Sequence, residues 1–204
     1  PKLAGPAATI VRQGRVDGIG LDLVELSNGV RLLISAGNAE AGKAYVSVRF
    51  GRGLQALPTD RPSLAWSGSG ALIASGTGDL GQDELDRLTS GRRLNMGFDI
   101  AEDAFRLTAV TRAADLDDQL RLLVAKLAFP RWDAAPVVRM RAAMLLGQRT
   151  IGASPGSVLG QELPGLLHGG DPRYTPPSLA QIEALTPAAF RAFWEPLLKT
   201  GPIE

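Results

Sequence analysis

The strongest helical signal in the sequence is an amphipathic segment, LDDQLRLLVAKLAF, at residues 116–129. Its leucines and its valine recur at helical spacing, which predicts a helix with one apolar face. Two segments precede it in which polar and apolar residues alternate, RRLNMGFDIA (92–101) and AFRLTAVTR (104–112), and they are typical of an antiparallel strand pair. A chain with both patterns has to bury a helix face against a sheet.

The other segments extend this arrangement in both directions. Upstream, LDLVEL (21–26) and VRLLI (30–34) flank Asn28 and Gly29, which predicts a hairpin closed by a type I′ turn. A further strand is expected at AYVSVRFG (44–51). A helix is expected at SLAWSGSGALIASGTG (63–78), although its Ser-Gly steps weaken that prediction, and a short helix is expected at QDELDRLTSG (82–91). Downstream helices are expected over 133–151, 154–169, 179–185 and 188–199, the last with Thr186 as cap and Pro187 in its first turn.

This order of elements predicts an α+β domain of two layers, a largely antiparallel sheet with helices packed on one face. The domain is expected to span residues 21–204, with residues 1–20 as a linker or leading segment. Because the sequence opens on a proline without an initiator methionine and stops at GPIE, we expect it to be excised from a longer polypeptide.

Composition narrows the possible functions. Lys and Arg number 22 against 21 Asp and Glu, so there is no excess charge to favour a nucleic acid. Cysteine is absent, which excludes disulfides and thiolate chemistry. No apolar run approaches the length of a membrane span, and the first residues lack the basic-then-apolar order of a signal peptide.

Candidate catalytic residues are scarce. The chain has one histidine, His168, which precedes two glycines and is expected to lie in a loop or to cap a helix. A catalytic zinc site needs three protein ligands, of which two or three are commonly histidines. A serine or cysteine triad needs a histidine beside its nucleophile. The glycine-rich stretch before residue 78 lacks the spacing of a phosphate-binding loop. Asp83, Glu84 and Asp86 are expected to form a solvated first helical turn.

Several phrases in order resemble the start of an M16 (insulinase-like, pitrilysin and processing-peptidase-like) zinc peptidase domain. They cover nearly the whole chain from residue 21: LSNGVRLLI, AYVSVRFGRG, a helix ending in SGTG, QDELDRLTSG, DLDDQLRLLVAKLAFPRWD, GDPRYTPPS and IEALTPAAFRAFWEPLL. The resemblance implies the LuxS/processing-peptidase-like metallohydrolase fold. In the family, the helix that ends in Gly-Thr carries H-x-x-E-H, in which two histidines bind zinc and the glutamate activates water, and a distant glutamate completes the site.

Aligning the Gly-Thr of the family with Gly76 and Thr77 assigns degenerate residues to this motif. Ser67 and Ala71 then take the positions of the histidines, and Gly70 that of the general base. The distant glutamate falls near Gly147 and Gln148. None of these residues supplies an imidazole or a carboxylate, so the resemblance implies no catalytic or metal-binding residue in this chain.

The resemblance therefore implies a non-catalytic domain of an M16 metalloendopeptidase that forms part of the substrate chamber. Its expected partners are other M16 domains of the same chain or a catalytic subunit, together with a peptide substrate, and zinc is expected in a catalytic half elsewhere in the parent. One alternative is a scaffold or assembly domain without peptidase activity. Another is an independent enzyme with unrecognised chemistry. Family members often reside in the periplasm or in organelles, which favours a periplasmic location.

Overall fold

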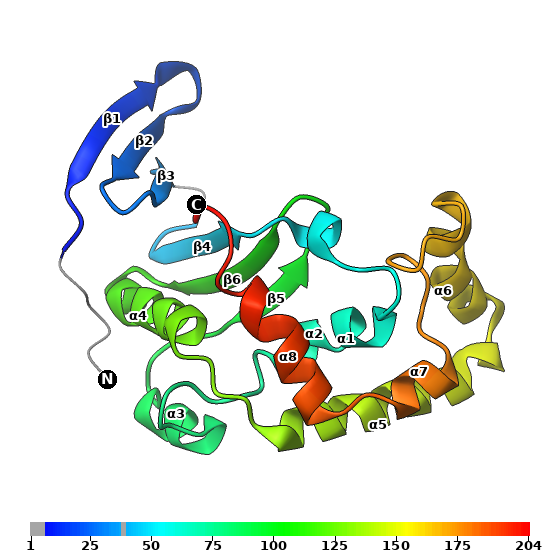
Figure 1. Cartoon of the computed structure of the whole chain (residues 1–204). Coiled ribbons are helices and arrows are strands. Elements are labelled where there is room, and N and C mark those ends of the chain that lie inside the picture. The colour runs from blue at the N-terminus through cyan, green and yellow to red at the C-terminus, as the bar shows by residue number, and fades with distance from the viewer. Residues whose placement is uncertain (1–6, 38–39) are drawn as a thin grey trace.

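The computed structural model describes residues 7–37 and 40–204, and side-chain placement at residue 63 lies outside that description. The described chain forms two three-stranded antiparallel sheets and a set of helices (Figure 1). The strands are β1 (Ile10–Val16), β2 (Leu21–Leu26), β3 (Arg31–Ser35), β4 (Lys43–Phe50), β5 (Gly97–Ile100) and β6 (Phe105–Arg112). The helices are α1 (Pro62–Trp66), α2 (Gly68–Ala71), α3 (Gln82–Leu88), α4 (Leu116–Ala128), α5 (Ala134–Thr150), α6 (Pro155–Leu167), α7 (Leu179–Glu183) and α8 (Pro187–Leu197). Within these residues, no helix is both long and apolar enough to cross a membrane.

The first sheet has the order β1-β2-β3 and stands apart from the helical part of the molecule (Figure 1). The hairpin between β2 and β3 is confirmed, but its predicted type I′ turn is wrong. Gly29 has a φ of 83°, whereas Asn28 lacks the positive φ that a type I′ turn requires. The Asn28 side chain instead accepts a hydrogen bond from the Val30 amide at 3.2 Å. Strand β1 lies within the leading segment 1–20, of which residues 1–6 are outside the described chain.

The second sheet has the order β4-β6-β5, and helices α2 and α4 pack against its strands β5 and β6. In β6 the buried residues alternate with half-buried ones, which is the pattern of a strand with one face on a core. The predicted α+β fold with antiparallel strands is therefore confirmed, with the strands divided between two sheets. Strand β5 starts later than expected because the Asn95 side chain bonds both the N–H and the C=O of Val110 in place of main-chain pairing.

The helices agree closely with the sequence pattern, with one exception. The segment 63–78 forms only two short helices, α1 and α2, joined at Ser67, and then a turn. Its glycines lower the helical stability of the segment, as expected. At the start of α8 the predicted cap is confirmed, because the Thr186 hydroxyl accepts a hydrogen bond from the Ala189 amide at 3.2 Å.

Trp194 on α8 lies at the centre of the core between the helices and the second sheet. Its side chain is fully buried, and its ring meets Phe98 and Phe105 of the sheet edge-on at centroid distances of 5.5 Å. The indole N–H donates to the carbonyl of Leu64 on α1 at 2.9 Å. Such a pairing satisfies the one polar atom of the ring inside an apolar core. One side chain thus connects α8, α1 and the sheet.

We predict that Trp194→Phe lowers the free energy of unfolding by about 2–4 kcal/mol, since it leaves a cavity and removes the indole hydrogen bond to the Leu64 carbonyl. Trp66, of which 42% is exposed, provides the matched control. Trp66→Phe is expected to change the same quantity by less than about 0.5 kcal/mol. Urea unfolding followed by circular dichroism measures both variants, and equal losses would contradict the central position of Trp194.

Candidate functional site

The two positions assigned to zinc-binding histidines lie inside the core. Ser67 is fully buried between α1 and α2, and its hydroxyl donates to the carbonyl of Leu64 at 3.0 Å. Ala71, the last residue of α2, is also fully buried. Both side chains are therefore already surrounded by protein, and neither faces an open metal-binding space.

Gly70, at the position assigned to the general base, lies against α5. A Cβ atom built on Gly70 would stand 1.8 Å from the terminal methyl carbon of Met140, so that methionine fills the space that a longer residue at Gly70 would need. Sequence reasoning did not single out Met140 for this role. Its spacing of four residues from Met144, on the apolar side of a predicted helix, is the signal that could have found it.

The two positions assigned to the distant glutamate lie farther along α5. Gly147 is exposed, and the Gln148 amide donates to the Pro177 carbonyl at 3.0 Å. Together with Trp66, they border a cavity of about 200 Å³ beside α6 and α7. Gly70 instead lines a different cavity, between α2, α3 and α4. The assigned motif positions therefore do not come together in one site. Two of them are buried in the core, and the others line two separate cavities.

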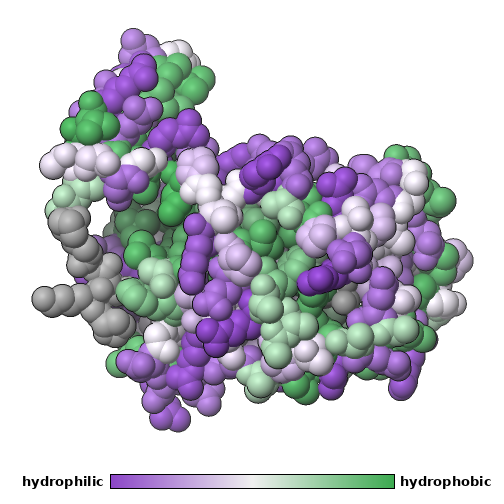
Figure 2. Space-filling model, viewed as in Figure 1, coloured by the Kyte–Doolittle hydropathy of each residue, from purple (hydrophilic) through white to green (hydrophobic). Residues whose placement is uncertain are grey.

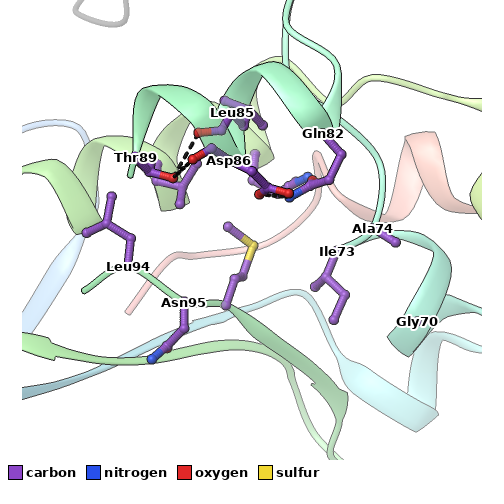
Figure 3. A pocket seen from close by; sticks show the side chains of 12 residues that line it. Gly70, Ile73, Ala74, Gln82, Leu85, Asp86, Thr89, Leu94 and Asn95 are labelled. Atoms are coloured by element: carbon purple, nitrogen blue, oxygen red, sulfur yellow. Dashed lines mark hydrogen bonds between the residues drawn. The ribbon is translucent and has the colours of Figure 1, made fainter. Parts of the chain in front are cut away.

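The cavity at Gly70 measures about 380 Å³ and lies between α2, α3, α4 and the segment before β5 (Figure 3). Ile73 and Leu85 give it apolar walls, and Asn95 lies on the side opposite α3 (Figure 3). Asp86 and Lys126 are the charged residues among those that line it. Asp86 accepts a hydrogen bond from Gln82 at 2.9 Å. The cavity is therefore mainly apolar, which is typical of a binding surface.

Lys126 on α4 is buried, and its ammonium group donates to the carbonyls of Ser75 and Gly76. Burial lowers the pKa of Lys126 to about 8, because desolvation disfavours the charged form, while the nearby Asp133 carboxylate acts in the opposite direction. Asp133 in turn accepts a hydrogen bond from the Gly76 amide at 3.0 Å. The two charged residues therefore hold the turn that follows α2.

Thr77 completes this turn. Its hydroxyl oxygen lies 2.7 Å from the Ala125 carbonyl on α4 and 2.9 Å from the Phe129 carbonyl just after it, so that the single O–H is shared between the two. Among the buried side-chain polar atoms of the described residues, none lacks a hydrogen-bond partner. The Gly-Thr pair used for the alignment is thus fixed by α4, and so is the position of the motif helix that precedes it.

The residues present do not fit the zinc ion that the fold implies. A catalytic zinc site needs three protein ligands with imidazole, carboxylate or thiolate groups. Ser67, Gly70 and Ala71 offer a hydroxyl engaged with a carbonyl, a hydrogen atom and a methyl group. In the part of the chain that the structure describes, no three His, Cys, Asp or Glu residues come close enough to hold a metal ion.

His168 caps the C-terminal end of α6 and lies far along the chain from this region. Its Nδ1 lies 2.7 Å from the Pro164 carbonyl, and its ring stacks on Tyr174 at a centroid distance of 3.6 Å. The sequence predicted a loop or capping role for this residue, and its contacts in the structure are of that kind.

Comparison with solved structures identifies the fold. The periplasmic protease PqqL from Escherichia coli matches with a TM-score of 0.77 and 20% identity over 95% of this chain. The ferredoxin protease FusC in complex with Arabidopsis ferredoxin matches with a TM-score of 0.74 and 16% identity over the whole chain. Pitrilysin matches with a TM-score of 0.68 and 14% identity over 98% of this chain. The first half of PqqL, solved alone, matches with a TM-score of 0.69 and 13% identity over 96% of this chain.

The chain therefore has the fold of one domain of the M16 proteases, as its sequence predicted. It covers 21% of the PqqL chain and 22% of both the FusC and pitrilysin chains, so it spans about a fifth of the length of these proteins. No family model and no curated protein sequence matches it. The fold likeness is thus stronger than the sequence likeness.

A pair of glycines in α2 offers a test of how tightly the degenerate motif is packed. A Cβ atom on Gly68 would stand 2.1 Å from the Trp194 ring, which is fully buried and cannot move aside. We predict that Gly68→Ala lowers the free energy of unfolding by about 1–3 kcal/mol through overpacking. Gly70→Ala meets only the flexible end of Met140 and is expected to stay within about 1 kcal/mol of the wild type. Similar losses in both variants, measured by urea unfolding, would contradict this difference.

The buried Lys126 predicts a pH dependence of stability. Its pKa is about 8 in the folded chain, below the value of about 10.4 for an unfolded lysine, so the unfolded state binds more protons between these values. Stability therefore rises with pH across this window, by up to about 3 kcal/mol from this residue alone. We expect the stability difference between the wild type and Lys126→Met to shift in favour of the wild type between pH 7.5 and 10. Urea unfolding at both pH values measures it, and a constant difference would refute the depressed pKa.

Proposed function

We propose that the chain is a non-catalytic domain of a longer M16-type zinc endopeptidase. In this proposal it forms part of the wall of the substrate chamber and packs against a catalytic half, which supplies the zinc and the chemistry. The observation that carries the proposal is the closed packing at the family's zinc position. Ser67 and Ala71 are fully buried there, Gly70 lies against Met140, and the surrounding fold is otherwise kept.

Two comparisons support a place in the second half of such a polypeptide. The chain spans about a fifth of proteins with the same fold, which fits one domain among several. The full-length PqqL structure matches better, with a TM-score of 0.77, than its first half alone, with 0.69. Because the chain matches the full-length protein better than its first half, we infer that it corresponds to a domain outside that half. PqqL is a periplasmic protease, which supports a periplasmic location for the parent of this chain.

A peptide-binding surface also has structural support. Strand β5 lies at an edge of the second sheet, and residues just before it line the cavity at Gly70. An extended peptide can add to a sheet edge through main-chain hydrogen bonds while neighbouring pockets take alternate side chains. An apolar cavity beside an edge strand offers both elements. The domain can therefore contact a peptide without holding a metal.

The proposal predicts where zinc is bound in the parent polypeptide. Metal analysis of the purified parent is expected to find about one zinc per polypeptide, as in a catalytic site with three protein ligands. Chain 1–204 alone is expected to bind no zinc and to cleave no peptide. In the parent, replacing the glutamate of its intact H-x-x-E-H by glutamine should abolish peptidase activity, whereas Gly70→Ala in this domain should leave the zinc content unchanged.

Two results would overturn the proposal. Stoichiometric zinc in the isolated chain would mean that the domain has a metal site of its own. A parent without H-x-x-E-H and without peptidase activity would support the alternative function, a scaffold or assembly domain.

A further inference from the structure

Asp115 and Lys126 are the buried charged residues of the described chain, and they differ in how their charges are compensated. The Asp115 carboxylate lies 2.5 Å from the Arg112 guanidinium. Within residues 7–37 and 40–204, no carboxylate forms an ion pair with the Lys126 ammonium group. The nearby Asp133 carboxylate is bonded instead to the Gly76 amide at 3.0 Å. Because buried charges are stable in proteins when they are paired, Lys126 lacks an expected anionic partner.

The ammonium group of Lys126 also has a free donor. It carries three N–H groups, and two of them donate to the carbonyls of Ser75 and Gly76. In the part of the chain that the structure describes, the third has no acceptor. Lys126 lines the cavity at Gly70, although the residue is only 6% exposed. A ligand bound in the cavity can therefore supply both the missing acceptor and the missing negative charge.

The burial of the lining residues gives this cavity a closed end and a mouth. Leu85 and Lys126 are buried, whereas Asp86 and Asn95 are exposed. Asp86 belongs to α3, and Asn95 lies on the side opposite that helix (Figure 3). The cation is thus at the closed end and the carboxylate of Asp86 at the mouth. The volume of about 380 Å³ lies within the range of small-molecule sites.

The polar side chains of the cavity are already engaged with the protein. Gln82 donates to Asp86 at 2.9 Å, and the Thr89 hydroxyl donates to a carbonyl of its own helix at 2.8 Å. The Asn95 side chain bonds the main chain of β6 at 2.7 and 3.0 Å. Amide groups of a peptide inserted here would lose water without gaining equivalent partners, which is costly. These contacts favour a ligand whose body is aliphatic.

The projecting first sheet also exposes apolar side chains, but it lacks a comparable charge (Figure 2). Ile203 bridges this sheet to the second one, since its carbonyl accepts from the Arg31 N–H of β3 at 3.0 Å and it forms an isolated bridge with Phe50 of β4. The Glu204 carboxylate there is paired with the Arg31 guanidinium at 2.9 Å. None of the buried charged residues of the described chain belongs to this sheet. The combination of an apolar cavity with an uncompensated buried cation is thus specific to the cavity at Gly70.

We propose that the cavity at Gly70 binds a medium-chain aliphatic monocarboxylate, whose carboxylate pairs with Lys126 and whose chain lies against Ile73 and Leu85. The Asp86 carboxylate at the mouth repels a second negative charge, so a monocarboxylate is bound in preference to a dicarboxylate of the same length. This binding site goes beyond the proposed function and does not require the parent to be a peptidase.

The test is a calorimetric titration of the purified chain at pH 7 with octanoate, octanol and octanedioate. We expect one octanoate per chain and affinities for octanol and octanedioate that are at least about tenfold lower, since the first lacks the charge and the second meets Asp86. Lys126→Met is expected to weaken octanoate binding by a similar factor. Lys199→Met is the matched control, because that side chain is 61% exposed, and it should bind octanoate as the wild type does.

A second measurement uses the wild type alone and therefore holds even if Lys126→Met does not fold. Burial lowers the pKa of Lys126 to about 8, and a bound carboxylate raises this pKa because it stabilises the ammonium form. Octanoate binding at pH 8 should therefore take up about half a proton per chain, and close to none at pH 6. Titrations in phosphate and Tris, which differ in ionisation enthalpy, measure this uptake. The other charged groups around Lys126, on Asp86 and Asp133, are carboxylates, which ordinarily titrate below pH 6.

Four outcomes would overturn the inference. Equal affinities for octanol and octanoate, or unchanged octanoate binding by a folded Lys126→Met, would mean that the ammonium group does not anchor the ligand. An absence of proton uptake at pH 8 would mean the same for the wild type. Tighter binding of N-acetylleucyl-leucine than of octanoate would assign the site to the carboxyl end of a peptide. None of these measurements involves zinc or peptidase activity, so the inference and the proposed function fail separately.

Discussion

The contact between the Trp194 indole and the Leu64 carbonyl is the interaction on which the rest of the fold depends. It ties the C-terminal helix to the segment that carries the degenerate motif, across about 130 residues of sequence. The same ring lies against the phenylalanines of the second sheet and directly over Gly68. Glycine at position 68 is therefore a packing requirement, since even a methyl group would collide with an immovable ring.

This dependence explains how the domain keeps the fold of the M16 proteases with small residues at the positions that the sequence resemblance assigns to zinc binding. Buried imidazoles without a metal would need other partners, and each unpaired polar group would cost stability. Small residues at positions 67, 70 and 71 avoid that cost and let α2 approach both α5 and α8. The turn after α2 keeps its own support from Lys126, Asp133 and Thr77, which hold it by hydrogen bonds independent of any ion.

The local elements were predictable because their patterns are strong and short in range. The amphipathic period of α4 and the cap at Thr186 lie within a few residues of the structure they specify. The late start of β5 was not predictable, because it depends on a tertiary bond between Asn95 and Val110. For the candidate site, the sequence resemblance was enough to assign the motif positions. The contact between Gly70 and Met140 was not predictable, because it depends on how two helices cross. The division of the strands into two sheets also follows from such long-range pairing.

The bridge formed by Ile203 has a consequence for how the chain acquires its structure. It joins β3 to residues roughly 170 positions later, and contacts of such wide sequence separation form slowly because a long loop must close first. On a ribosome, the first sheet would be complete early and yet wait for residues 203 and 204 before it could be fixed to the second. Throughout that interval the exposed apolar residues of β3, among them Leu33 and Ile34, would stay open to solvent.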